Sequence, residues 1–152
     1  MEGLAGLTIK TKIRILKPAG QVYEAIVDPQ KMSHYFISKG SGRMESGKDL
    51  IWRFPEFDMD VPISVQNTVA DQYISYYWDE RDKKHLVEIT LEADGSYATI
   101  VSVSEGGEDN DEAGIGWLQR NTEGWANFLA CLKAYLEYGI NLRKGAFDFL
   151  KK

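Results

Sequence analysis

The feature that most constrains the fold is a change of hydrophobic period late in the chain. Between Leu50 and Ser104 apolar residues alternate with polar ones, which is the pattern of strands with one buried face. Beyond residue 110 the apolar residues recur at helical spacing on one face: Leu118, Trp125, Phe128, Leu129, Leu132, Tyr135 and Leu136. The sheet and the long helix each have one apolar face, and both faces are buried when the helix lies across the sheet.

The alternating runs place the strands. They are expected at Leu7–Leu16, Leu50–Phe54, Val61–Val65, Ile74–Trp78, Val87–Leu91 and Tyr97–Ser104. Asp94-Gly95 predicts a hairpin with a type I′ turn, whose two central residues need positive φ. Because the connections are short, we expect an antiparallel meander.

Two short helices are expected between the first strand and the rest of the sheet. One carries Val22, Ala25 and Ile26 and ends at Asp28-Pro29; the other covers Gln30–Phe36. Glycines and serines make 39–47 a turn or hairpin. The fold class is therefore α+β, a helix-grip arrangement in which a curved antiparallel sheet of about six or seven strands holds one long C-terminal helix.

The domain organisation follows from length and from the absence of a linker. The 152 residues make one domain, 1–152, with a core of about 8–139 and an extension, 140–152, that Phe147, Phe149 and Leu150 would dock. The long helix is expected over 110–139, with a cap from Asp109 and Glu112 and a stop at Gly139. Gly124 inside it suggests close packing at that point.

Charge and composition exclude several partners. The formal net charge is −5, and lysines and arginines are scattered among acids, so neither nucleic acid nor an anionic membrane is expected. No apolar run approaches the roughly 18 residues of a membrane span. The single cysteine excludes an intrachain disulfide, and the first residues lack the pattern of a signal peptide, so the expected location is cytoplasmic.

The motifs that could carry chemistry each have a simpler interpretation. The segment 42–49 approaches a phosphate-binding loop, but Asp49 stands where a hydroxyl is needed and a strand follows. His34 and His85 have no partner at fixed spacing, and His85 is expected at an exposed strand start, so no metal site is predicted. Cys131 is expected as a packed thiol, and the acids from Glu105 to Glu112 as a solvated loop. No catalytic residue and no cofactor is predicted.

Two stretches carry a family resemblance. Lys17 to Phe36, KPAGQVYEAIVDPQKMSHYF, and Gly124 to Gly139, GWANFLACLKAYLEYG, resemble the opening and the closing helix of the heat-shock-protein-90 ATPase activator homologue-like domains. Ile74–Trp78 and 99–106 resemble two strands of the same family. The family belongs to the superfamily of START and birch-pollen-allergen-like proteins, and the resemblance implies a helix-grip fold with a cavity between sheet and helix.

An aromatic set gives the candidate site. By parity, four side chains of the strands share the face that the long helix covers, and further residues project from that helix and from the second short helix. On spacing alone they are core; the resemblance favours a ligand cavity lined by Phe36, Trp52, Phe54, Tyr76, Trp78, Trp125, Phe128 and Leu132.

Three functions stay open at this point. The first is a module that binds a small apolar or aromatic ligand, lipid- or polyketide-like, as a monomer or homodimer. The second is a chaperone-associated interaction protein, which the family name implies. The third is a cyclase-like enzyme, which would need polar groups in the cavity; the available ones are His34, Tyr35, Arg53 and Tyr76. Fold alone does not decide among them.

Overall fold

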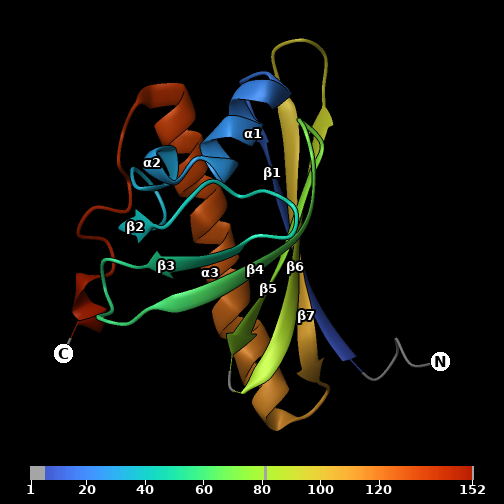
Figure 1. Ribbon diagram of the computed structural model, residues 1–152, viewed down its shortest axis with the longest axis vertical. Coiled ribbons are helices and arrows are strands. Elements are labelled where there is room, and N and C mark those ends of the chain that lie inside the picture. The colour runs from blue at the N-terminus through green and yellow to red at the C-terminus, as the bar shows by residue number, and fades with distance from the viewer. Residues whose placement is uncertain (1–5, 81, 152) are drawn as a thin grey trace.

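The computed structural model describes residues 6–80 and 82–151 and shows a curved seven-stranded antiparallel sheet with a long helix across one face (Figure 1). The strand order is β1-β7-β6-β5-β4-β3-β2. The strands are β1 Gly6–Ile15, β2 Lys39–Gly40, β3 Asp49–Arg53, β4 Val61–Val69, β5 Tyr73–Glu80, β6 Lys83–Ala93 and β7 Thr99–Asp109. The helices are α1 Ala19–Val27, α2 Pro29–Met32, α3 Glu112–Tyr138 and the 3₁₀ turn η2 Asp148–Leu150. The predicted helix-grip fold is confirmed.

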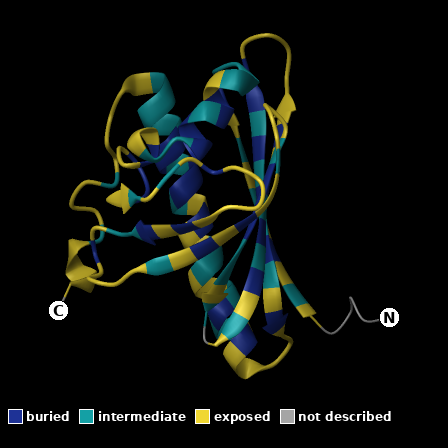
Figure 2. Ribbon diagram, in the orientation of Figure 1, coloured by how far each residue is buried: buried dark blue, intermediate teal, exposed yellow. Residues whose placement is uncertain are grey.

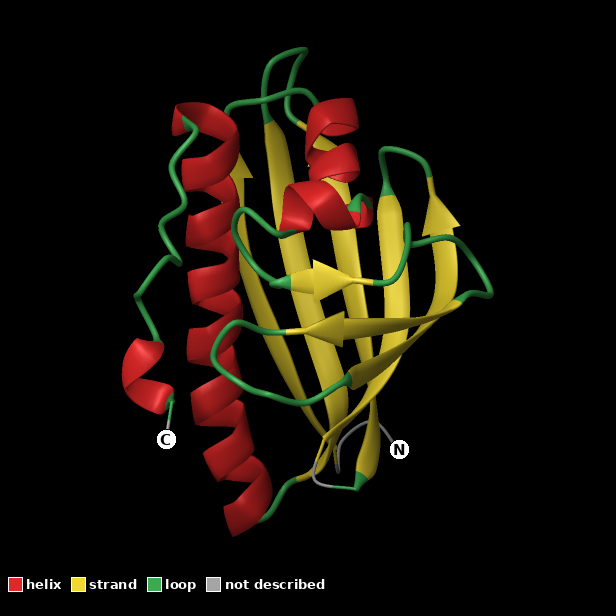
Figure 3. Ribbon diagram, turned by 60° about the vertical axis from the view of Figure 1, so that its left-hand side comes forward, coloured by secondary structure: helices red, strands yellow, loops and turns green. Residues whose placement is uncertain are grey.

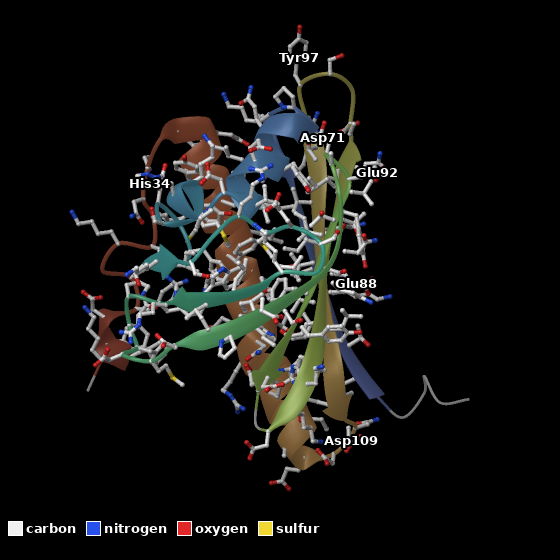
Figure 4. The ribbon with its side chains drawn as sticks, in the orientation of Figure 1. His34, Asp71, Glu88, Glu92, Tyr97 and Asp109 are labelled. Carbon is white, nitrogen blue, oxygen red and sulfur yellow. The ribbon has the colours of Figure 1, made fainter. Side chains whose placement is uncertain are left out.

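The two faces of the sheet differ as the alternating pattern predicts. Along β6, Val87 and Ile89 are buried toward α3, whereas Glu88 and Glu92 project from the opposite face (Figure 4). Figure 2 shows the same alternation of buried and exposed residues along the neighbouring strands. The core therefore lies between the inner face of the sheet and α3.

Both ends of α3 are capped by local sequence. The Asp111 carboxylate accepts a hydrogen bond from the Gly114 backbone N–H at 2.7 Å, so Asp111 rather than Asp109 is the N-cap. Gly139 adopts the left-handed conformation, φ 66°, and its N–H donates to the carbonyls of the last turn. The predicted stop at Gly139 is confirmed.

The short helices lie beside the C-terminal part of α3. Asp28 caps α2 by accepting from the Gln30 backbone N–H at 2.9 Å. The Tyr35 hydroxyl donates to the Ala25 carbonyl at 2.8 Å, and the Tyr35 ring packs 5.7 Å from that of Phe128 on α3. The expected second helix, Gln30–Phe36, is shorter than predicted because only 29–32 are helical and turns follow.

Three further expectations need correction. The last strand continues to Asp109, so residues 105–109 of the acidic run are strand and not loop. The Asp94-Gly95 hairpin forms, but only Gly95 has positive φ, 76°, and the Asp94 N–H donates to the Ala98 carbonyl, so the turn is not type I′. Gly124 is exposed and a Cβ there would meet nothing within 4 Å, so close packing is not its role.

The segment after α3 folds back along that helix (Figure 3), and its end lies beside Pro55 and Glu56 in the loop that follows β3. Arg143 holds it through an ion pair with Glu56, at 2.7 Å. Of the three residues expected to dock the segment, Phe147 is half-buried, whereas Phe149 and Leu150 are exposed. No helix in the described ranges has both the length and the apolar character needed to cross a membrane.

Candidate ligand site

The structure brings the eight residues of the predicted cavity into one cluster between the sheet and α3. The Phe36 and Phe128 ring centroids are 4.7 Å apart, and those of Trp78 and Trp125 are 5.9 Å apart. Most of the ring pairs are edge-to-face or tilted, which are favourable arrangements for aromatic rings. Parity on the strands and helical spacing on α3 thus located a real three-dimensional cluster.

The cluster has a floor and a mouth. Trp52, Tyr76, Phe128 and Leu132 are at most 1% exposed and form the floor as packed core. Two polar atoms of this floor, Trp52 Nε1 and Tyr76 Oη, have no hydrogen-bond partner in the part of the chain that the structure describes. Burial raises the pKa of Tyr76 well above its ordinary value, so its hydroxyl stays protonated.

The mouth is an open cleft of about 180 Å³. Its walls are the other four aromatic residues of the predicted set, together with polar residues of β5, α3 and the C-terminal segment. The lining consists of Phe36, Phe54, Trp78, Glu80, Asn121, Gly124, Trp125 and Arg143. We call this the aromatic cleft. The open space therefore lies where β5, α3 and the C-terminal segment meet, next to the packed floor of the cluster.

Glu80 and Asn121 form one polar edge of the aromatic cleft. The Asn121 side-chain amide donates to both carboxylate oxygens of Glu80, at 3.1 and 2.8 Å. Burial, and then repulsion from Glu105, raises the pKa of Glu80 above its ordinary value. The negative charge of Glu80 is thus less well stabilised by its surroundings than it would be in water.

Arg143 forms the opposite edge. Its guanidinium lies 5.8 Å from the ring centroids of both Phe36 and Phe54 and 4.9 Å from that of Phe147. These distances are within the range of cation–π attraction. Because Arg143 also pairs with Glu56, one side chain of the C-terminal segment both ties that segment down and narrows the aromatic cleft.

A buried carboxylate holds two walls of the cleft in place. Glu105 accepts hydrogen bonds from the indole N–H groups of Trp78, at 3.0 Å, and Trp125, at 2.7 Å. Glu105 itself is fully buried. Since the two indoles come from β5 and α3, this carboxylate links sheet and helix directly behind the cleft.

His85 continues this network, and its placement corrects the expectation of an exposed residue. Its Nδ1 lies 2.7 Å from Glu105 and its Nε2 2.7 Å from Glu108, and the imidazole is fully buried against Trp117. Burial lowers the pKa of His85, but the hydrogen bonds to the two carboxylates outweigh it, so the pKa lies above its usual value. A protonated imidazole can donate to both neighbours at once.

A β-bulge brings the two carboxylates to the same face. Residues three apart on a regular strand face opposite sides, yet Glu105 and Glu108 are both buried. Where β7 pairs with β1, Thr8 is opposite Gly106 and Leu7 is opposite Glu108, which leaves Gly107 as the extra residue, with φ 141°. The glycine pair within a strand pattern was the available signal for this bulge.

The raised pKa of His85 gives a testable pH dependence. The stabilisation from its protonated form is complete below the unfolded-state pKa of about 6.5 and is lost as pH rises through the higher folded-state pKa. We therefore expect the free energy of unfolding in urea to fall as pH rises above about 6.5. The His85→Leu variant should lack this part of the pH dependence; an identical profile for both proteins would contradict the assignment.

The polar residues considered for an enzyme do not converge. His34 is exposed and stacks on Tyr135 with ring centroids 5.4 Å apart (Figure 4), and Arg53 pairs with Asp58 and Asp60. The Tyr35 hydroxyl is used by its bond to a backbone carbonyl, and Tyr76 lies in the floor.

The single thiol and the acidic and histidine side chains are the remaining candidates for reactive chemistry or metal binding. Cys131 is buried, and burial raises its pKa, as expected for a packed thiol. Within the described ranges, no group of three or more histidine, cysteine, aspartate or glutamate residues is arranged to hold a metal ion.

Solved structures of several other proteins share this fold. The protein SSP2350 from Staphylococcus saprophyticus is 32% identical, with a TM-score of 0.78, over 90% of this chain and 96% of that one. DynU16, from a dynemicin biosynthetic locus, is 22% identical with a TM-score of 0.78; 88% of this chain matches 48% of that longer one. A START superfamily protein from Mycobacterium smegmatis is 12% identical with a TM-score of 0.69, over 86% of this chain and 97% of that one.

Sequence comparison defines the family. No curated protein matches the sequence closely enough to count as a relative. The profile of the family described as "Activator of Hsp90 ATPase homolog 1-like protein" matches residues 17–137, which span the opening segment, the sheet and nearly all of α3. With its START-like helix-grip fold, the chain belongs to the family of activator of Hsp90 ATPase homolog 1-like proteins.

Proposed function

We propose that this protein is a small-molecule binding module whose ligand places an apolar or aromatic group in the aromatic cleft. The observation that carries the proposal is the convergence of Phe36, Phe54, Trp78 and Trp125 around about 180 Å³ of open space. Ligand sites are mostly apolar with a few placed polar groups, and Glu80 and Asn121 supply such groups here.

The size of the aromatic cleft limits the part of the ligand that it can enclose. Its volume is below the roughly 300–1,000 Å³ of drug-sized sites, so one or two fused rings or a short alkyl chain fit. Burying that surface contributes about 25 cal/mol per Å², so a modest affinity does not require charge. A larger ligand would extend out of the cleft toward the C-terminal segment.

The other two functions have less support. A chaperone-associated role is suggested by the family description, and binding of the purified protein to heat-shock protein 90 tests it. A cyclase role would need polar groups facing one space, and the four residues considered for it are dispersed. The origin of DynU16 in a biosynthetic locus supports a small-molecule ligand more than either a chaperone or a particular reaction.

Calorimetric titration with naphthylethanol, a neutral bicyclic probe, tests the proposed function. We expect Phe54→Ala to weaken binding about tenfold, or ~1.4 kcal/mol, because it removes one wall of the cleft. The matched control is Tyr97→Ala, an exposed aromatic residue at the tip of the β6–β7 loop (Figure 4), which should leave binding unchanged. Equal weakening by both variants, or no binding to the unaltered protein, would contradict the proposal.

A further inference from the structure

We propose that the ligand of the aromatic cleft is an organic cation, an apolar or aromatic body that carries an ammonium group beside Glu80. This inference rests on the proposed function and adds the charge of the ligand to it. Three features of the cleft support it: the cation already present, the sign of the surrounding charges, and the pairing of the nearby basic groups.

The first feature is that the walls of the cleft already hold a cation. The Arg143 guanidinium lies at the same distance, 5.8 Å, from the ring centroids of Phe36 and Phe54. Aromatic faces attract cations through the negative potential above the ring, and groups of such faces are used to bind quaternary and methylated ammonium ions. Trp78 and Trp125 line the same cleft, whereas the ring contacts described for Arg143 are with Phe36, Phe54 and Phe147.

The second feature is a negative charge at the inner edge. Glu80 lines the cleft, and the hydrogen bonds described for its carboxylate come from the neutral amide of Asn121. Glu105 lies behind the two indoles and repels Glu80. An ammonium group at this edge would relieve that repulsion and form a charge-assisted hydrogen bond, which is stronger than one from a neutral donor.

The third feature is that two described basic groups near the cleft, Arg143 and His85, already have acidic partners. Arg143 pairs with Glu56, whose side chain is only 2% exposed, and His85 lies between Glu105 and Glu108. Arg143 keeps one buried donor, Nε, without a hydrogen-bond partner among the described residues, but turning the guanidinium from Glu56 toward an acidic ligand would leave a buried carboxylate without its partner. An anionic ligand would also face Glu80, so the cleft favours the opposite charge.

The test compares three probes that share a naphthyl ring: protonated naphthylethylamine, neutral naphthylethanol and anionic naphthylacetate. Calorimetric titration near neutral pH should show the amine binding at least tenfold more tightly than the other two. Glu80→Gln should remove this preference, because loss of the charge weakens amine binding far more than it weakens naphthylethanol binding. The matched control, Glu92→Gln, neutralises a carboxylate on the outer face of the sheet and should keep the preference (Figure 4).

A second variant keeps the test independent of Glu80. Arg143→Ala removes the cation that stacks on Phe36 and Phe54, so it should strengthen amine binding severalfold. If the natural ligand were an acid that Arg143 recognises, the same variant would instead weaken naphthylacetate binding. Thermal unfolding of each variant shows whether it is folded at the temperature of the titration.

The outcomes separate the two proposals. Equal affinity for all three probes, or tighter binding of naphthylacetate, would overturn the cation proposal and leave the binding module intact. A preference for the amine that survives Glu80→Gln would also overturn it, because the charge would then act elsewhere. Failure of all three probes to bind would overturn both proposals.

Discussion

Replacing His85 with leucine is expected to lower the free energy of unfolding by about 3–5 kcal/mol. The imidazole lies between Glu105 and Glu108, at 2.7 Å from each, and all three side chains are almost completely buried. Leucine fills similar space but leaves the two carboxylates close together without the cation between them. Removing one partner from a buried ionic group is much more destabilising than replacing the whole group.

Urea unfolding at about pH 5.5, below the unfolded-state histidine pKa of about 6.5, measures this effect where the contribution of protonated His85 is complete. The matched control is the same substitution at the other histidine. His34→Leu should change the free energy of unfolding by less than about 1 kcal/mol, because His34 is exposed and contacts one ring. Similar losses for the two variants would show that the buried position of His85 has no special energetic role.

Gly107→Ala is expected to be the second severe substitution, lowering the free energy of unfolding by more than about 2 kcal/mol. At φ 141° an L-residue is strained, and a Cβ would lie 2.7 Å from His85 Cδ2 and 2.8 Å from the Lys84 carbonyl oxygen. The backbone atom cannot move without disturbing β6. The bulge that presents Glu108 to His85 therefore requires glycine.

The same change at Gly124 is the control and should have the opposite sign. Gly124 lies in the exposed interior of α3 with open space around it, so alanine should stabilise the protein by up to about 1 kcal/mol. In Gly107→Ala, NMR titration should also find the pKa of His85 lower than in the unaltered protein, since Glu108 is displaced. An unchanged stability and pKa would show that the bulge accommodates a side chain.

The sequence predicted the architecture because its pattern is regular where the fold is regular. Strict alternation along 50–54 and 74–78 placed Trp52 and Trp78 on the inner face, and helical spacing placed Trp125 opposite them. Gly139 ended the long helix as expected. Periodicity shows which face of the sheet a side chain lies on, but not how deeply it is buried. Tyr76 and Trp78 share a face, yet Tyr76 lies in the packed floor and Trp78 lines the aromatic cleft.

The polar part of the site escaped sequence reasoning for two physical reasons. The acidic, glycine-rich run after Ser104 predicts a solvated loop, whereas β7 continues to Asp109 and the extra residue at Gly107 turns Glu108 to the buried face. Arg143 lies in a segment without periodicity, and its partners Glu56 and Phe36 are distant in sequence. Its position depends on tertiary contacts, which spacing along the chain does not encode.

The course of the C-terminal segment also affects how the protein should be handled in the laboratory. Lys151 and Lys144 border a groove of about 390 Å³ that shares Phe36 and Arg143 with the aromatic cleft. An affinity tag, dye or fusion partner joined after Lys151 would start beside the aromatic cleft and compete for space with the proposed ligand. Immobilisation through β1, at the opposite edge of the sheet from β2 and β3, would leave the aromatic cleft open.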